Sequence, residues 1–453
     1  MSEKPKITNL TEMSLNKAIL TMALPASGIM LLESLYQFVD SFWIGKLGQI
    51  PLAAVSACTF LLWMFFSFGD IGNIAGSALT ARAIGAGDEH KIQDYFRQCM
   101  VVNFVTSVIL MIVILFIMDH IFVILGLEPD VVSQAGEYFM PWVLSLPIIL
   151  LAMLMSAVFR GSGDTKTPMY LSIVLVVINA ILDPVFIFGF GPIPAMGVSG
   201  AAWVSVVNHF VFVGLGYHIL NKRQLWPKWL GLRSFMMSKE HLLQIVKMGL
   251  PMALNGALFS LTYVGLTWVI AHFGSASVAA IGMGHRLESF PWFVSYGFSV
   301  AAASVVGQFL GANKPKVAEW AVWKTAMLAG LVISIFVVAM WFWVEPVVRF
   351  FIDDSAVVFE ASRYVRIASV CWLVGVLEVV CEGGFSGAGH TLPTMLIGVP
   401  LTVARIPVAY FMAITLDMGI IGVWYAIGGT MIAKGLLMAY WFRRGGWKTS
   451  KVS

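Results

Sequence analysis

Four side chains in the first half of this 453-residue sequence could together hold a proton or a metal cation. Tyr36 and Asp40 are four residues apart, as are Asn179 and Asp183, so each pair shares one face of a helix. Where two such faces meet, two carboxylates, an amide and a phenol gather. Two close carboxylates either take up a proton or bind a cation such as sodium through several oxygens. The spacing therefore predicts a cation site and leaves the choice between proton and sodium open.

Pro184 adds a further oxygen to this predicted site. A proline inside a helix removes one backbone hydrogen bond, which frees the carbonyl of Ala180 one turn from Asp183. An aspartate at mid-bilayer costs roughly 2.5 to 3.5 kcal/mol on insertion scales, so such residues normally face a cavity and have a function. The alternative is that Asp40 or Asp183 lies at the external rim, where it is hydrated or pairs with Lys46.

The segments that carry these residues are apolar enough to cross a membrane. Hydrophobic residues make up 59% of the chain and charged residues 11%, with a mean hydropathy of +0.86, whereas soluble domains carry about 25% charge. Apolar stretches of about twenty residues recur, each long enough for a bilayer core of roughly 30 Å. We expect an all-α integral membrane protein, a monomer in contact with the lipid bilayer. Its twelve expected transmembrane helices lie near residues 16–43, 52–80, 98–120, 138–160, 167–189, 196–220, 242–271, 277–309, 319–343, 363–388, 393–415 and 418–442.

The distribution of basic residues predicts the orientation. The termini, the even-numbered loops and the adjoining helix ends hold 21 Lys and Arg residues, and the opposite side holds four. By the positive-inside rule both termini are expected in the cytoplasm. The net charge of +4 then reflects topology and contact with the lipid surface, so we expect no nucleic-acid partner.

A shift of 226 residues aligns the two halves of the chain. Leu24 and Pro25 match Leu250 and Pro251, and FRGSGDTKTP at 159–168 matches FSGAGHTLP at 385–393. A repeat of six helices is parallel, with a pseudo-two-fold axis along the membrane normal, and it places a substrate cavity between two bundles. The expected parts are an N-lobe (residues 1–220, helices one to six), a cytoplasmic linker (221–240) and a C-lobe (241–453, helices seven to twelve).

The two aspartates of the predicted cation site have no acidic counterparts at the aligned positions of the second half. Function is expected where the halves differ, because a shared scaffold needs shared glycines but a coupling site can lie in one half. The aligned pairs are Asp40 with Leu266, Asp183 with Ala409, Asn179 with Arg405, and Tyr36 with Thr262.

Further charged residues lie in or near the expected spans. Glu33 is one helix turn from Gln37 and two from Asp40, so it could extend the acidic face towards a cavity. Acids in the second half have two interpretations, structural pairing with Arg286 or Arg405 and contact with substrate. The candidate substrate-cavity residues are Glu33, Gln37, Glu288, Glu378 and Glu382.

Three motifs resemble the multidrug and toxic compound extrusion (MATE) transporters, particularly their DinF-like branch. They are FVDSFWIGKLG (38–48), FRGSGDTKTP (159–168) and INAILDPVFIFG (178–189), and the resemblance covers nearly the whole chain. It implies an inner-membrane antiporter that expels amphipathic, often cationic compounds in exchange for protons or sodium by alternating access. It also implies that Tyr36, Asp40, Asn179 and Asp183 form an N-lobe cation site. The NorM-like branch places functional acids in helices seven and ten, but this chain has no acid in helix seven.

Two other function classes compete with the antiporter. A lipid-linked precursor flippase is the alternative, yet it needs a strongly basic cavity, and only Arg286, Arg405 and Lys434 lie well within the expected spans. An enzyme is not expected, because the eight histidines form no metal-binding spacing and no nucleophile motif precedes a suitable histidine. We expect no cofactor apart from the coupling ion, and no metal other than sodium at Asp40, Asn179 and Asp183.

Overall fold

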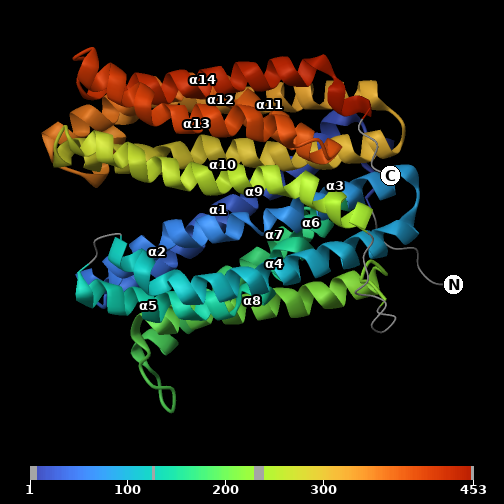
Figure 1. Ribbon diagram of the computed structural model, residues 1–453, viewed down its shortest axis with the longest axis horizontal. Coiled ribbons are helices and arrows are strands. Elements are labelled where there is room, and N and C mark those ends of the chain that lie inside the picture. Colours follow the sequence, from blue (N-terminus) through green and yellow to red (C-terminus); the bar gives the residue numbers. More distant parts are fainter. Residues whose placement is uncertain (1–7, 125–127, 229–238, 450–453) are drawn as a thin grey trace. The chain divides into compact units, whose positions relative to one another are not determined.

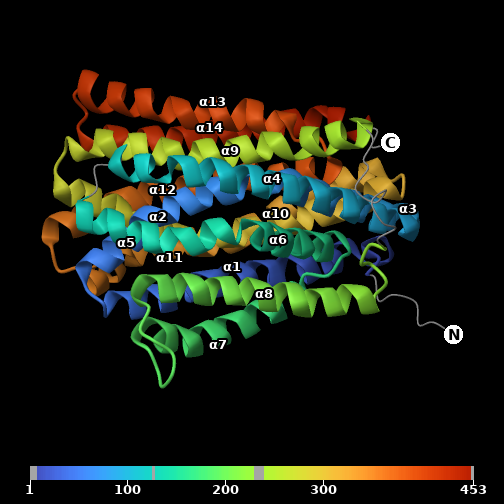
Figure 2. The same ribbon diagram turned by 60° about the horizontal axis from the view of Figure 1, so that its bottom comes forward.

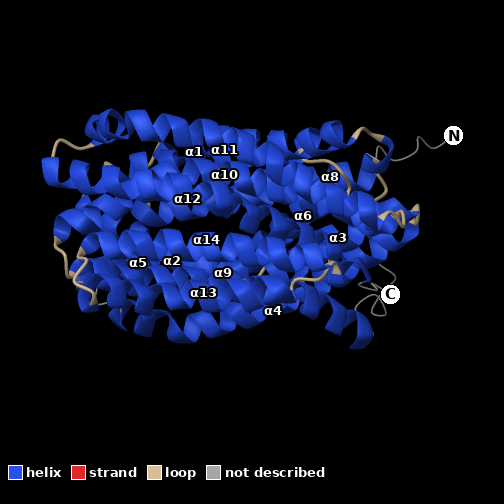
Figure 3. Ribbon diagram, turned by 90° about the horizontal axis from the view of Figure 1, so that it is seen from above, coloured by secondary structure: helices blue, strands red, loops and turns tan. Residues whose placement is uncertain are grey.

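A computed structural model describes residues 8–124, 128–228 and 239–449, and within these ranges the chain is helical (Figure 3). An isolated β-bridge joins Phe190 to Ile193. Eleven of the described helices are long and apolar enough to cross a membrane, and a bent helix pair makes a twelfth. The predicted all-α membrane fold is confirmed. Residues 229–238 of the expected linker lie outside the described residues.

The first repeat is built from eight helices within the described ranges. They are α1 (Leu15–Gly45), α2 (Gln49–Ser67), α3 (Asp70–Ala86), α4 (Glu89–Ile124), α5 (Pro129–Leu144), α6 (Leu146–Gly161), α7 (Lys166–Phe188) and α8 (Gly197–Lys222). In the views of Figures 1 and 2, α7 runs beside α8, in agreement with their residue contacts.

The second repeat has fewer and longer helices. They are α9 (Lys239–Ala271), α10 (Ser275–Gly311), α11 (Pro315–Phe351), α12 (Ser355–Ala388), α13 (Leu392–Tyr410) with a π-helical turn at Phe411–Thr415, and α14 (Ile420–Arg444). Figure 1 shows α13 and α14 lying together.

The repeats differ where the first one is interrupted. One expected span divides into α2 and α3, while its counterpart α10 is continuous. Another divides into α5 and α6, which bend by 58° around Ser145, while α12 is continuous. Pro147 lies in the first turn of α6, where a missing N–H is tolerated and continuation of the preceding helix is disfavoured. The sequence predicted a single span in each place, so both breaks are differences from that prediction.

Residue contacts divide the chain into two compact units. The first unit contains Met1–Asn9 and Gly28–Ala253, and the second contains Leu10–Ser27 and Leu254–Ser453. The divisions fall within α1 and α9, close to Pro25 and Pro251, where each helix lacks a backbone hydrogen bond. These bounds differ from the expected lobes, because the first part of α1 groups with the second repeat and the first part of α9 with the first.

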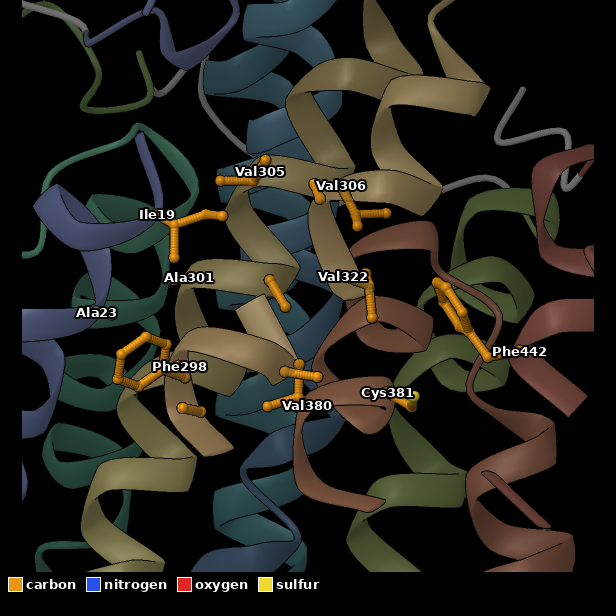
Figure 4. Packing of buried hydrophobic residues seen from close by; sticks show 14 of the residues in the cluster. Ile19, Ala23, Phe298, Ala301, Val305, Val306, Val322, Val380, Cys381 and Phe442 are labelled. Carbon is orange, nitrogen blue, oxygen red and sulfur yellow. The ribbon is translucent and has the colours of Figure 1, made fainter. Parts of the chain in front are cut away.

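The core of the second unit is packed tightly around α10. Figure 4 shows Ile19 and Ala23 of α1 near Phe298 and Ala301 of α10, and all four belong to one buried apolar cluster. Close helix contact depends on glycine, since a Cβ at Gly387 would lie 2.1 Å from the carbonyl oxygen of Ala303.

The first unit has the same glycine contact at the two positions that the 226-residue shift aligns with Gly387 and Ala303. A Cβ at Gly161 would lie 2.4 Å from the carbonyl oxygen of Ser77. The next glycines, Gly163 and Gly389, have φ angles of 78° and 67°, a left-handed conformation that glycine adopts without steric cost. In each Gly-rich motif, the first glycine therefore allows the close helix contact and the second allows the turn.

Candidate cation and substrate sites

The first unit brings together Asp40 of α1 and two residues of α7, Asn179 and Asp183, which we call the acid cluster. The Asn179 Nδ2 donates to Asp40 Oδ1 at 2.9 Å and to Asp183 Oδ1 at 3.0 Å. Asn179 and Asp183 are fully buried and Asp40 is 7% exposed. One amide thus bridges two carboxyl groups that are shielded from solvent.

Two oxygens of the acid cluster lack a hydrogen-bond partner among the described residues, namely Asn179 Oδ1 and Asp183 Oδ2. A buried acceptor without a donor costs about 1–3 kcal/mol, and more if it is charged. A proton shared by the acids, or a cation bound by carboxylate and amide oxygens, would remove this cost. No three His, Cys, Asp or Glu side chains of the described chain gather around a metal position. A cation here would therefore need amide or backbone oxygens as further ligands.

Tyr36 lies one helix turn from Asp40, but its hydrogen bonds lead to α8. Its hydroxyl donates to Ser205 Oγ at 2.7 Å and accepts from Asn208 Nδ2 at 3.2 Å. Ser205 and Asn208 are buried polar residues that the sequence analysis missed. Their separation by three residues on one helix, and the alignment of Ser205 with Ile427 after the four-residue deletion, were signals that could have identified them.

Lys46 does not neutralise Asp40. The Lys46 ammonium lies 4.6 Å from the ring centroids of both Phe42 and Trp43. The ion pairs between described residues include neither Lys46 nor Asp40. The interpretation of Asp40 as a rim residue paired with Lys46 therefore lacks support, whereas the role of the acid cluster as a cation site stays a prediction.

Glu33 and Gln37 lie on an exposed side of α1 and do not join the acid cluster. The Arg160 guanidinium of α6 is a charge that acts on Glu33. Although Glu33 is two turns from Asp40, the two side chains differ in burial, because Asp40 is covered by α7. Contact of Glu33 and Gln37 with substrate stays a prediction.

The glutamates of the second unit have partners that the sequence did not predict. Glu378 of α12 pairs with Lys434 of α14 at 2.6 Å, and Glu382 accepts from Asn255 Nδ2 at 3.1 Å. Pairing of these acids with Arg286 or Arg405 is not found, because the ion pairs of the described residues include neither arginine. The sequence could not select Lys434, since α12 and α14 meet only through tertiary packing.

Glu288 of α10 is held by two side chains of α12. It accepts from the Tyr364 hydroxyl at 2.6 Å and from Trp372 Nε1 at 3.1 Å. Glu288 remains partly exposed while both donors are buried. Its carboxylate is thus fixed in position, and no ion pair between described residues includes it. This geometry suits contact with a cationic group.

The loop between α6 and α7 holds a second polar contact in the first unit. Asp164 accepts from the backbone N–H of Thr167 at 2.9 Å and pairs with Arg223 at 2.6 Å. Burial alone would raise the pKa of Asp164, but the hydrogen bonds from Thr167 and Arg223 outweigh it and lower that pKa. In the second unit the register position is His390, whose pKa is lowered by burial.

Comparisons with known proteins agree with the repeat. The MatE family profile matches residues 25–185 and again residues 251–411, so the two matches are offset by 226 residues. The chain is 26% identical over 441 residues to a probable multidrug resistance protein NorM of Thermotoga maritima, covering 97% of this chain and 94% of that protein. It is 27% identical over 356 residues to an FAD transporter of Shewanella oneidensis, with 78% of each covered.

Similarity to solved structures concerns the fold. A multidrug resistance MATE family transporter in an outward-facing conformation has a TM-score of 0.90 with this chain at 23% identity. The alignment covers 99% of this chain and 100% of that one.

Proposed function

We propose, since the chain belongs to the MatE family of multi-pass membrane transporters, that it exports amphipathic, often cationic small molecules in exchange for protons or sodium ions. It works in the inner (plasma) membrane with both termini in the cytoplasm, as the distribution of basic residues predicts. The relative named as a probable multidrug resistance protein supports drug extrusion. Such transport forms and breaks no covalent bond in the substrate, so the proposed function is not that of an enzyme.

The acid cluster is the observation that carries the proposal. Its two buried carboxyl groups accept hydrogen bonds from one amide, and two of its oxygens have no hydrogen-bond partner among the described residues. Arrival of a proton or a sodium ion from outside cancels charge between α1 and α7 and lets the two helices pack differently. In this scheme the neutralised state favours release of substrate outside, and loss of the ion to the cytoplasm resets the transporter.

The available driving force is sufficient for drug export. One charge that crosses 100 mV releases about 2.3 kcal/mol, and one unit of pH gradient adds about 1.4 kcal/mol for a proton. For a substrate without net charge, these together support a gradient of roughly several hundred-fold. Export of a monovalent cation cancels the electrical part, so one proton then supports only about tenfold per unit of pH gradient. A larger gradient requires more than one ion per substrate.

The test is dye efflux from proteoliposomes with pH and sodium gradients imposed separately. The wild type is compared with Asp40→Asn and Asp183→Asn, which keep the side-chain volume and remove the charge. We expect both variants to insert and fold but to lose the acceleration that a gradient produces. The gradient that drives the wild type identifies the coupling ion.

The matched control is Asp88→Asn, because Asp88 forms a surface pair with Lys91 and its side chain is 39% exposed. This variant should retain coupling. Undiminished gradient-driven efflux in Asp40→Asn would remove the acid cluster from the mechanism, and transport by the wild type without any gradient would favour a channel or a flippase.

The flippase alternative is not favoured by the charges of the second unit. A pyrophosphate-linked lipid requires several uncompensated cations in one cavity. Lys434 is neutralised by Glu378, and of the cations well within spans only Arg405 is both buried and without an acidic partner among the described residues.

A further inference from the structure

Arg405 of α13 is a buried cation without a counter-ion. Its side chain is 2% exposed, and no ion pair between described residues includes it. Its Nε donates to Thr430 Oγ1 at 3.0 Å and its Nη1 donates to the Tyr263 hydroxyl at 2.9 Å. Both partners are neutral. An isolated charge in a low-dielectric interior is costly, so a cation held there by two hydroxyl groups is arranged to receive an anion.

The Tyr263 hydroxyl extends this donor set. It accepts from Arg405, so its own O–H remains available as a donor beside the guanidinium. Tyr263 is only partly buried, whereas Arg405 is enclosed. A carboxylate that approaches along Tyr263 would meet an O–H donor and the remaining N–H groups of a planar guanidinium, which is the geometry that binds carboxylates most strongly.

A row of aromatic rings leads from Arg405 to Glu288. The Tyr263 ring lies 4.8 Å from the His285 ring, and the His285 ring lies 6.2 Å from the Tyr364 ring, measured between centroids. Tyr364 then donates to Glu288.

His285 provides an independent observation at the middle of the row. Its Nε2 is buried and has no hydrogen-bond partner in the described structure. A buried ring nitrogen without a partner costs free energy unless a ligand supplies the missing contact. The row therefore has a fixed cation at one end, a fixed carboxylate at the other, and an unused polar atom between them.

We propose that the second unit contains a binding site for zwitterionic amphipathic substrates, in which Arg405 and Tyr263 bind the carboxylate and Glu288 binds the cationic group. The body of such a molecule contacts the partly exposed side chains of Tyr263 and His285, while the fully buried Tyr364 holds Glu288 in place. This proposal rests on the proposed export function and specifies its substrate class. Purely cationic compounds contact Glu288 but not Arg405, so they bind more weakly than zwitterionic compounds.

The test compares two dyes that differ by one charge. A rhodamine with a free benzoate carboxylate is a zwitterion, and its methyl ester has the same cationic ring system without the carboxylate. Their dissociation constants for the full-length protein in detergent are measured by fluorescence polarisation. We expect the wild type to bind the free acid at least about tenfold more tightly, as a charge-assisted bidentate contact provides.

Variants at the two ends of the row should act differently. Arg405→Gln should abolish the preference for the free acid and leave the affinity for the ester within about twofold. Arg405→Lys should keep part of the preference, because it retains the charge but loses the planar fork. Glu288→Gln should weaken both dyes by a similar factor. If Arg405→Gln does not fold, the wild-type comparison and Arg405→Lys still decide the question.

Equal affinity of the wild type for both dyes would overturn the proposal, and so would an equal loss for both dyes in Arg405→Gln. Export of the two dyes from proteoliposomes separates this inference from the proposed function. A binding preference without gradient-driven export would refute the antiporter and leave the site intact. Export without a preference would refute the site alone.

Discussion

The acid cluster of the first unit and the Arg405 site of the second occupy equivalent places in the repeat but carry opposite charge. Asn179 and Arg405 are aligned by the 226-residue shift, and both are buried on the seventh and thirteenth helices. The amide of Asn179 joins two acids, whereas the guanidinium of Arg405 donates to two neutral hydroxyl groups. A duplicated scaffold thus supplies two interior positions, and single side chains decide whether each one attracts a cation or an anion.

The two regions also differ in the partners that their acidic side chains have. Acids of the second unit are paired or held by donors, as Glu378 is by Lys434. In the first unit, Asp40 and Asp183 of the acid cluster share one amide donor. Charge in the second unit therefore contributes to fixed structure and selectivity, while charge in the first is arranged so that a mobile ion changes it.

The largest effect is expected from removal of the bridging amide. Asn179→Ala deletes two hydrogen bonds to carboxyl groups, each worth about 1.5–3 kcal/mol, and leaves the acids without a common donor. Gradient-driven efflux should fall at least about tenfold, measured in proteoliposomes. Asn221→Ala, at an exposed position near the end of α8, is the control. Normal coupling in Asn179→Ala would show that the two acids work independently of the amide.

The next effect concerns stability rather than transport, and it is opposite in sign between the two regions. Glu378→Gln leaves Lys434 buried without its partner and should lower the free energy of unfolding by about 3–5 kcal/mol. Asp40→Asn relieves repulsion between two acids and should leave stability unchanged or raised. Thermal unfolding in detergent measures both.

The reference for that comparison is an exposed pair, Arg349 with Glu345, whose side chains are 52% and 49% exposed. Glu345→Gln should cost less than about 1 kcal/mol. Similar losses in Glu345→Gln and Glu378→Gln would contradict the assignment of Lys434 and Glu378 as a buried structural pair.

The loop before α7 should show a moderate effect at acidic pH. The pKa of Asp164 is lowered in the folded state, so its stabilisation is present above the unfolded value of about 3.9 and is lost as the pH falls through the folded value. Asp164→Asn should lower the free energy of unfolding by about 1.5–3 kcal/mol at neutral pH. It should also reduce the further loss of stability as the pH falls into the acidic range. Unfolding midpoints measured from pH 7 downwards test this, and an unchanged loss of stability at acidic pH would contradict it.

The smallest effect belongs to the equivalent loop of the second unit. The lowered pKa of His390 means that its neutral ring is favoured in the folded state. Stability should therefore be full above the unfolded value of about 6.5 and decrease as the pH falls from there towards the folded value. His390→Gln should remove this decrease and leave the more acidic transition of Asp164 in place. A pH profile identical to wild type would show that His390 titrates alike in both states.

Much of the fold could be predicted because it depends on local sequence. Hydropathy located the spans, and the glycines of the two matching motifs predicted tight turns that the structure contains at Gly163 and Gly389. The breaks at Gly69 and Ser145 could not be predicted in the same way, because an interrupted span is as apolar as a continuous one. The four-residue spacing of Asn179 and Asp183 was sufficient to predict that they share a helix face.

The sequence by itself determined that the chain lies in a membrane, that it is built from a repeat, and that its first half carries an unmatched pair of acids. These properties follow from side-chain transfer energies and from helix periodicity, which act within a segment. Only the tertiary structure decided which segments meet. It placed Asp40 against Asn179 across 139 residues of sequence and gave Glu378 to Lys434 rather than to Arg405. Such pairings depend on how each helix is rotated and packed against its neighbours, and no single segment encodes that geometry.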